Sequence, residues 1–181
     1  RELLAAPGLP VHCLPGNHDS QEAMQAMLSE APFRFCGIGD YPPWRLILLI
    51  SRMAGDDGGF LATHELEKLQ QALTTHREGH VLIALHHQPV PMGSRWLDTV
   101  GLRNAAAFFA VTDRHPQLRA IVWGHVHQAS DQLRNGVRLI STPSTCAQFL
   151  PAADTFTLDT RPPGYRWLDL HPDGTIQTSV V

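Results

Sequence analysis

The stretch VLIALHHQP, residues 81–89, decides the fold, because an apolar run of strand length ends there at two adjacent histidines. The same order recurs at residues 118–127, where LRAIVW is followed by GHVH, and at residues 11–19, where VHCLP is followed by GNHD. Short continuous apolar runs are typical of buried strands. The three polar motifs therefore lie on loops at strand ends, where binding chemistry is usually found.

The segments between these runs have helical spacing. Ser20 is predicted to cap a helix that continues to about Glu30, and Thr63 a second helix with apolar residues three and four apart. A third helix is predicted over residues 104–112. Buried strands that alternate with helices predict an α/β fold in which helices cover a sheet.

The second half of the chain has a different pattern. Residues 55–59, GDDGG, are predicted to break the chain after an apolar run at residues 44–50. Asn135-Gly136 is a strong two-residue hairpin signal, and Pro172-Asp173-Gly174 predicts another turn. The tail is therefore predicted to form hairpins that make a second sheet packed on the first. Residues 1–181 are predicted to be a single domain.

Composition narrows the class of protein. The chain has 181 residues, 43% of them hydrophobic, and a formal net charge of −3. Without a Lys/Arg run it is not predicted to bind nucleic acid, and without an apolar stretch of ~18–20 residues it is not predicted to span a membrane. Three scattered cysteines indicate free thiols, and a cytoplasmic protein is predicted. Arg1 in place of Met favours a fragment that lacks its N-terminus.

The chain has eleven histidines, a number that favours metal binding or acid–base chemistry. Asn17, His86, His125 and His127 offer one amide oxygen and three imidazole nitrogens, a donor set that suits Fe, Mn, Zn or Co better than copper(I) or an iron–sulfur cluster. His125 and His127 are two residues apart, so in a regular strand both would point to one face. On an irregular loop they could diverge and reach two adjacent metals.

The motifs GNHD, HHQP, GHVH, TPSTC (142–146) and PGYR (163–166), in this order, resemble those of the calcineurin-like metallophosphoesterases. Within that family, residues 51–53, 58–61 and 142–149 resemble the class III cyclic-AMP phosphodiesterases, although Ile50 stands where relatives commonly have Asp. The resemblance implies a four-layer α/β/β/α sandwich with two packed mixed sheets. In the family, an Asp-x-His and a Gly-Asp motif come before the Asn-His motif, and this chain has neither ahead of Asn17-His18. It is therefore predicted to be the C-terminal two-thirds of the domain, with the N-terminal strands missing.

The resemblance also implies a ligand set. Asn17, His86 and His125 correspond to ligands of one metal, and His127 to a ligand of the other. His87 is predicted to support its neighbours through hydrogen bonds rather than to bind metal.

Two further residues have implied roles in catalysis. His18 corresponds to the family's histidine beside the substrate phosphate, which does not bind metal, and Asp19 to the carboxylate that orients it. Asn17, His18 and His127 are the residues expected to contact the substrate.

The function implied by the resemblance is metal-dependent hydrolysis of 3′,5′-cyclic AMP to 5′-AMP at a centre of two divalent ions. Fe and Mn are the favoured metals, with Zn and Co as alternatives. The small-molecule substrate is the expected partner, and a homodimer is compatible with the sequence. The 181-residue chain alone is expected to be nearly inactive. Two alternatives are a metallophosphoesterase that acts on another phosphodiester or nucleotide, and a protein that binds a nucleotide or a partner without catalysis.

Overall fold

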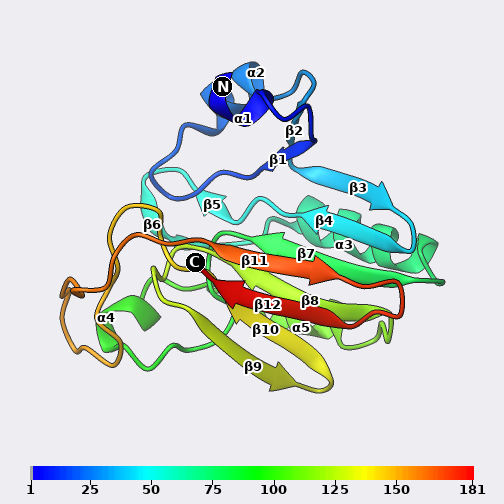
Figure 1. The fold of residues 1–181 in the computed structure, drawn as a ribbon. Helices are drawn as coiled ribbons and strands as arrows, with labels where there is room; N and C mark the ends of the chain where they lie inside the picture. Colours follow the sequence, from blue (N-terminus) through cyan, green and yellow to red (C-terminus); the bar gives the residue numbers. More distant parts are fainter. Residues whose placement is uncertain (1) are drawn as a thin grey trace.

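The computed structural model describes residues 2–181 and is built around one mixed sheet (Figure 1). Its strand order is β3-β4-β7-β8-β10-β9. Strands β4, β7, β8 and β10 run parallel, and β3 and β9 pair antiparallel at the two edges. The strands are β3 Gly37–Tyr41, β4 Trp44–Leu48, β7 His80–Leu85, β8 Leu118–Trp123, β9 Ser130–Arg134 and β10 Val137–Ser141.

Both faces of this sheet are covered (Figure 1). Helices α3 (Thr63–Thr75) and α5 (Ala105–Thr112) bury one face together with the loop that carries α4 (Arg95–Asp98). The hairpin of β11 (Arg166–Leu170) and β12 (Ile176–Val180) packs on the other face. The described residues thus supply a helix layer, a six-stranded sheet and a second, two-stranded sheet. This arrangement confirms the predicted α/β class.

Both predicted hairpins of the tail are present, but only one of them lies in a second sheet. Asn135 and Gly136 have φ of 51° and 82°, as a hairpin turn of this type requires, and they join β9 to β10. However, β10 pairs parallel with β8 inside the main sheet. Two successive residues of β10, Leu139 and Ile140, are both buried, in the cores on opposite faces of the sheet. A strand that buries both faces belongs inside a covered sheet, so only β11–β12 forms the second one.

Residues 2–36 form a separate substructure beside β3 (Figure 1). It contains α1 (Glu2–Ala5), β1 (Val11–Cys13), α2 (Gln21–Met27) and β2 (Phe33–Phe35), with β1 and β2 paired in parallel. The Ser20 hydroxyl accepts a hydrogen bond from the Ala23 N–H, which confirms the predicted cap. The helix ends at Met27, earlier than the predicted Glu30.

Two local predictions need correction. The second helix has Ala62 at its N-cap rather than Thr63, because the Ala62 carbonyl accepts the first bonds of the helix from Glu65 and Leu66. The predicted break at 55–59 contains a short strand, β6 (Asp56–Gly59), which pairs with β5 (Arg52–Met53).

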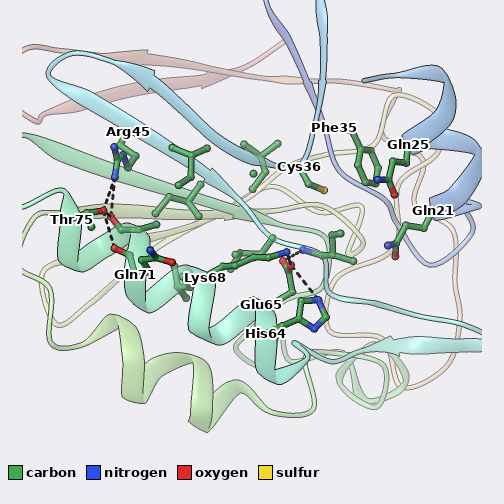
Figure 2. A pocket seen from close by; sticks show the side chains of 18 residues that line it. Gln21, Gln25, Phe35, Cys36, Arg45, His64, Glu65, Lys68, Gln71 and Thr75 are labelled. Carbon is green, nitrogen blue, oxygen red and sulfur yellow. Dashed lines mark hydrogen bonds and ion pairs between the residues drawn. The ribbon is translucent and has the colours of Figure 1, made fainter. Parts of the chain in front are cut away.

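A cavity of about 730 Å³ lies between α2, β4 and α3 (Figure 2). Glu65 on its wall is buried, but its carboxylate accepts hydrogen bonds from the Ile50 N–H and from Lys68. Burial raises the pKa of the Cys36 thiol to about 12, so this wall cysteine stays protonated. Within residues 2–181, none of the predicted site residues lines this cavity. No helix in this range has the length and apolar character to cross a bilayer.

Candidate metal-binding site

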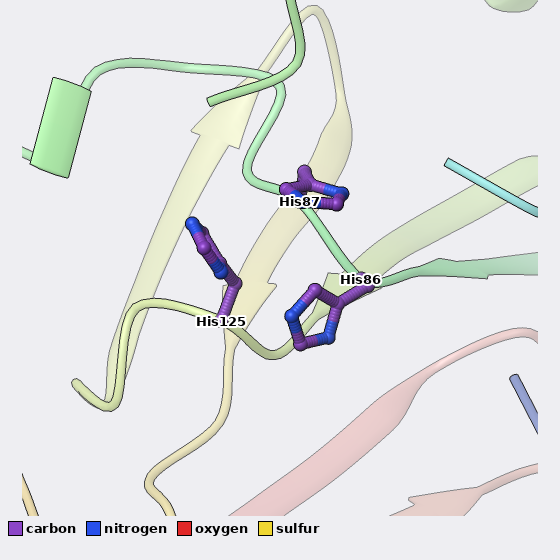
Figure 3. A group of neighbouring side chains, drawn as sticks. All are labelled: His86, His87 and His125. Carbon is purple, nitrogen blue, oxygen red and sulfur yellow. The ribbon is translucent and has the colours of Figure 1, made fainter. Parts of the chain in front are cut away.

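Three loops meet beyond the carboxyl ends of the central parallel strands. Because β7 and β8 are adjacent and parallel, the residues that follow them lie at the same end of the sheet. His86 and His87 follow β7, His125 follows β8, and the three rings face one another (Figure 3). One ring nitrogen from each lies within 4.8 Å of the others. The neighbouring strands thus bring His125 beside His86 and His87, although 38 residues separate it from the nearer of the two in the sequence.

Asn17 reaches the same cluster from the loop after β1. Its Oδ1 lies 3.0 Å from His86 Nε2, while its Nδ2 donates to Asp57 Oδ1 at 3.3 Å. The carboxylate of Asp57 therefore fixes which end of the amide faces the histidines. Asn17 thus contacts His86, whose ring lies 5.0 Å from that of His125, and the ligand roles of all three residues stay predictions.

His87 and His125 differ in how their ring nitrogens are used. His87 is fully buried, with Nδ1 2.8 Å from Ser51 Oγ and Nε2 3.2 Å from the Asp57 carbonyl oxygen. In contrast, Nε2 of His125 is buried and has no hydrogen-bond partner among the described residues. A buried unpaired nitrogen is costly unless a ligand satisfies it. This contrast favours His125 as a ligand and His87 as a supporting residue, and both assignments stay predictions.

His127 lies outside the group of three histidines whose ring nitrogens approach one another. Both His125 and His127 have positive φ, 61° and 47°, so the loop is irregular. The two rings have different neighbours: His125 contacts the rings of His86 and His87. The His127 ring stacks on Phe149 at 4.1 Å and 8°. Its Nδ1 lies 2.7 Å from the Ala147 carbonyl oxygen, which can only accept, so this nitrogen carries the proton. The lone pair is therefore on Nε2, the form that a metal ligand needs.

The histidines are neutral in this environment. Burial lowers the pKa of His86 to about 2, with further lowering by the neighbouring imidazoles. Burial is also the main reason that the pKa falls to about 3 for His125 and about 4 for His87. The pKa of His127 is lowered as well, again mainly by burial. Neutral imidazoles keep the lone pairs that a divalent cation requires.

His18 and Asp19 are exposed beside this cluster. The Asp19 carboxylate accepts from the Gly16 N–H at 2.8 Å, and the Asp19 N–H returns a bond to the Gly16 carbonyl. His18 Nε2 instead lies 3.4 Å from Asn17 Nδ2. In this structure Asp19 therefore holds the turn of the GNHD loop. Its carboxylate contacts the Gly16 backbone in place of the expected His18 side chain.

The sequence did not single out some residues that shape the site. Asp57 contacts both Asn17 and His87, but its segment was expected only to break the chain. Ser51 lies in a motif that was noted for its resemblance alone, and no role was assigned to its hydroxyl. An acid directly before two glycines was the available signal for Asp57, since such glycines mark a close approach of backbone to another group.

Two glycines allow the loops to approach the histidines closely. A Cβ at Gly59 would lie 2.5 Å from His87 Cγ, and one at Gly16 would lie 2.7 Å from His86 Cε1. Both contacts are far inside van der Waals distance. Only glycine fits at these positions while the rings keep their places.

We expect Gly59→Ala to destabilise the protein, because the added methyl would displace a buried histidine ring. Overpacking of this kind typically costs about 1–3 kcal/mol. The corresponding fall in Tm is roughly 2–12 °C for a chain of this size, measured by thermal denaturation. Gly124→Ala is the matched control at the same site, since its Cβ would make an ordinary contact of 3.6 Å with His86. Equal effects of the two substitutions would contradict this explanation.

The donor set fits a divalent transition metal. Asn17 contributes an amide oxygen, His86 and His125 contribute neutral imidazoles, and the unpaired His125 Nε2 is a coordination site without another occupant. Nitrogen and oxygen ligands without thiolates are typical of Zn, Fe and Mn sites.

Comparison with known proteins agrees with the geometry. Residues 1–129 match the model of the family described as calcineurin-like phosphoesterase. The chain is 43% identical over 180 residues to the 3′,5′-cyclic adenosine monophosphate phosphodiesterase CpdA of Pseudomonas aeruginosa, and 43% identical over 182 residues to CpdA of Escherichia coli K12. Each alignment covers 99% of this chain and 66% of the relative, so the chain spans slightly less than two thirds of their length.

The fold has relatives among solved structures. A dimetal phosphatase from Danio rerio superimposes with a TM-score of 0.64 at 16% identity, over 91% of this chain and 70% of that one. At this identity the likeness concerns the fold alone. The family match covers most of the sequence and includes all three histidine-bearing loops. The chain belongs to the calcineurin-like phosphoesterase family.

Proposed function

We propose that the protein to which this chain belongs hydrolyses 3′,5′-cyclic AMP to 5′-AMP at a centre of two divalent metals. The observation that carries the proposal is the convergence of Asn17, His86 and His125 from three separate loops. The names of the two CpdA relatives, similar along 99% of this chain, supply the substrate. The three free cysteines fit a reducing compartment, and we include a cytoplasmic location in the same proposal.

Asn17, His86 and His125 would hold one ion, and His127 would contribute Nε2 to the second. We favour Fe or Mn over Zn and Co. When bound, such a pair of ions neutralises the phosphate charge and makes water a stronger nucleophile at neutral pH.

The reaction needs one proton transfer that this chain can supply. As a water oxygen bonds to phosphorus, the bond from phosphorus to the ribose O3′ breaks, and O3′ must receive a proton. His18 is exposed beside Asn17 and is free of the buried cluster, so it can approach the departing oxygen. We assign His18 as the proton donor and Asn17 and His127 as the neighbouring residues that contact substrate. Asp19 holds the turn of the loop that carries Asn17 and His18.

The test is a comparison of substrates with the native-length protein loaded with Mn or Fe. We expect cyclic AMP to be hydrolysed with a higher kcat/KM than glycerophosphodiesters or nucleoside monophosphates. A higher kcat/KM for one of those esters would favour the alternative of a metallophosphoesterase that acts on another phosphodiester or nucleotide. Tight binding of cyclic AMP without turnover would favour the alternative of a non-catalytic nucleotide-binding protein.

For the 181-residue chain by itself, we expect one tightly bound metal and negligible turnover of cyclic AMP. Asn17, His86 and His125 form one set of neutral donors, whereas His127 is a single ligand turned toward Phe149. Two-metal hydrolysis requires both ions in place. Elemental analysis after dialysis, together with an assay in added Mn, checks both expectations. Turnover equal to that of the full-length CpdA relatives would contradict the assigned ligand set.

A further inference from the structure

Three aromatic side chains form a cluster next to His127. Trp96, Phe149 and Phe156 contact one another edge to face, with ring centroids 5.1–5.3 Å apart. We call this set the aromatic platform. Such T-shaped contacts are the favoured geometry of aromatic pairs. Trp96 comes from α4, and the two phenylalanines come from the long segment between β10 and β11.

The platform is joined directly to the candidate metal site. Phe149 stacks flat on the His127 ring at 4.1 Å, and Phe156 is the next ring outward, 5.3 Å from Phe149. The distance between the centroids of the His127 and Phe156 rings is therefore no greater than the sum of these two distances. A nucleoside whose phosphate lies at His127 can span such a path.

Phe156 is the member of the platform that is open to contact. It is 60% exposed, whereas Trp96 and Phe149 are partly buried and pack against the main core. The loop places a large apolar ring at the surface beside a polar site, where it has no role in the core. Phe156 is also part of a contiguous cluster of rings rather than an isolated exposed side chain, and contiguous apolar surface rimmed by polar residues marks binding sites.

We propose that the aromatic platform receives the nucleobase of the substrate, with Phe156 as the stacking surface. The inference rests on the proposed function and adds to it the part of the molecule that recognises the base. A purine is flat and uncharged, and it stacks on aromatic rings in proteins. The phosphate is excluded from this position by its charge, so the base lies at the platform and the phosphate at the histidines.

The geometry separates the roles of the two phenylalanines. Phe149 covers one face of His127, and thus it positions that ring. Phe156 makes no ring contact with a histidine in the described residues, so its loss should leave the histidines in place. Phe156 is therefore the residue to test.

The experiment compares cyclic AMP with ribose 3′,5′-cyclic phosphate, which lacks the base, in the native-length protein. We expect Phe156→Ala to raise KM for cyclic AMP by about 5- to 150-fold, the range that one stacked base supports, with little change in kcat. KM for the base-free substrate should not change, and Phe156→Tyr should restore the wild-type KM. Trp167→Ala is the control, since Trp167 is similarly exposed, at 56%, on β11.

Three results would overturn the inference. An equal rise in KM for both substrates would show that Phe156 has a structural role. An unchanged KM for both would show that Phe156 does not contact the base, and would favour a protein partner as the ligand of the exposed ring. An equal effect of Trp167→Ala would show that any exposed aromatic residue matters. If the wild type does not hydrolyse cyclic AMP, the proposed function fails first. The platform is then tested by equilibrium dialysis with AMP and ribose 5-phosphate, where Phe156→Ala should weaken only AMP.

Discussion

His86→Ala is expected to abolish tight binding of the metal ion that Asn17, His86 and His125 would share. His86 is the link of this set, because its Nε2 lies 3.0 Å from Asn17 Oδ1 and its ring lies 5.0 Å from that of His125. Removing it takes away one ligand and separates the other two. Elemental analysis of the dialysed protein should find that ion lost, and phosphodiesterase activity should fall with it.

His87→Ala is the matched comparison, since His87 is the adjacent residue and lies in the same cluster. Both of its ring nitrogens already have protein partners, so we expect metal affinity to fall by about 10- to 100-fold rather than to vanish. His87 is fully buried, and circular dichroism must show that the variant is folded. His87→Gln keeps polar groups near Ser51 and serves if the alanine variant does not fold. A greater loss of metal affinity in the His87 variant than in the His86 variant would show that His87, and not His86, is the ligand.

His18→Ala is expected to lower kcat by about 10²–10⁴-fold while metal content stays the same, as is typical for loss of a general acid. The side chain is exposed and lies outside the group of three histidines whose nitrogens approach one another. Its removal should therefore leave the metal ligands and the fold intact. Kinetics and elemental analysis on the same preparation measure both quantities.

A substrate with a better leaving group provides the control for His18. Such a substrate needs less help from a proton donor, so the variant should recover much of its rate with an aryl phosphodiester. Loss of metal in parallel with activity would instead make His18 a ligand. An equal loss of rate on both substrates would show that His18 acts in positioning and not as the acid.

The parts of the site that the sequence predicted are those at strand ends. Apolar runs at residues 81–85 and 118–123 could form adjacent parallel strands, and this alone places His86 and His125 at one edge of the sheet. The loop geometry was harder to predict. The sequence did not predict the contact between Asp19 and Gly16. It forms because, in a short loop, a carboxylate can accept a hydrogen bond from the nearby backbone instead of contacting the next side chain.

The missed elements depend on contacts between distant segments. Asp57 is important because β6 brings it to Asn17 and His87, which lie 40 and 30 residues away. Trp96 and Phe156 meet only because a loop without regular structure folds back on α4. In the same way, β10 entered the main sheet because both of its faces find apolar neighbours there. Periodicity describes one segment at a time and carries no signal for such pairings.

Asn17 and His18 belong to a part of the chain with little buried surface. Within residues 2–36, only Pro15, Gly16 and Phe33 are buried, whereas His86 and His125 follow the central strands of the sheet. Segments with little buried surface open at a lower free-energy cost than a core does. Amide hydrogens of β1 and α2 should therefore exchange with solvent deuterium sooner than those of β7 and β8. A bound ion would join the two regions through Asn17, so metal should slow exchange most in the N-terminal segment.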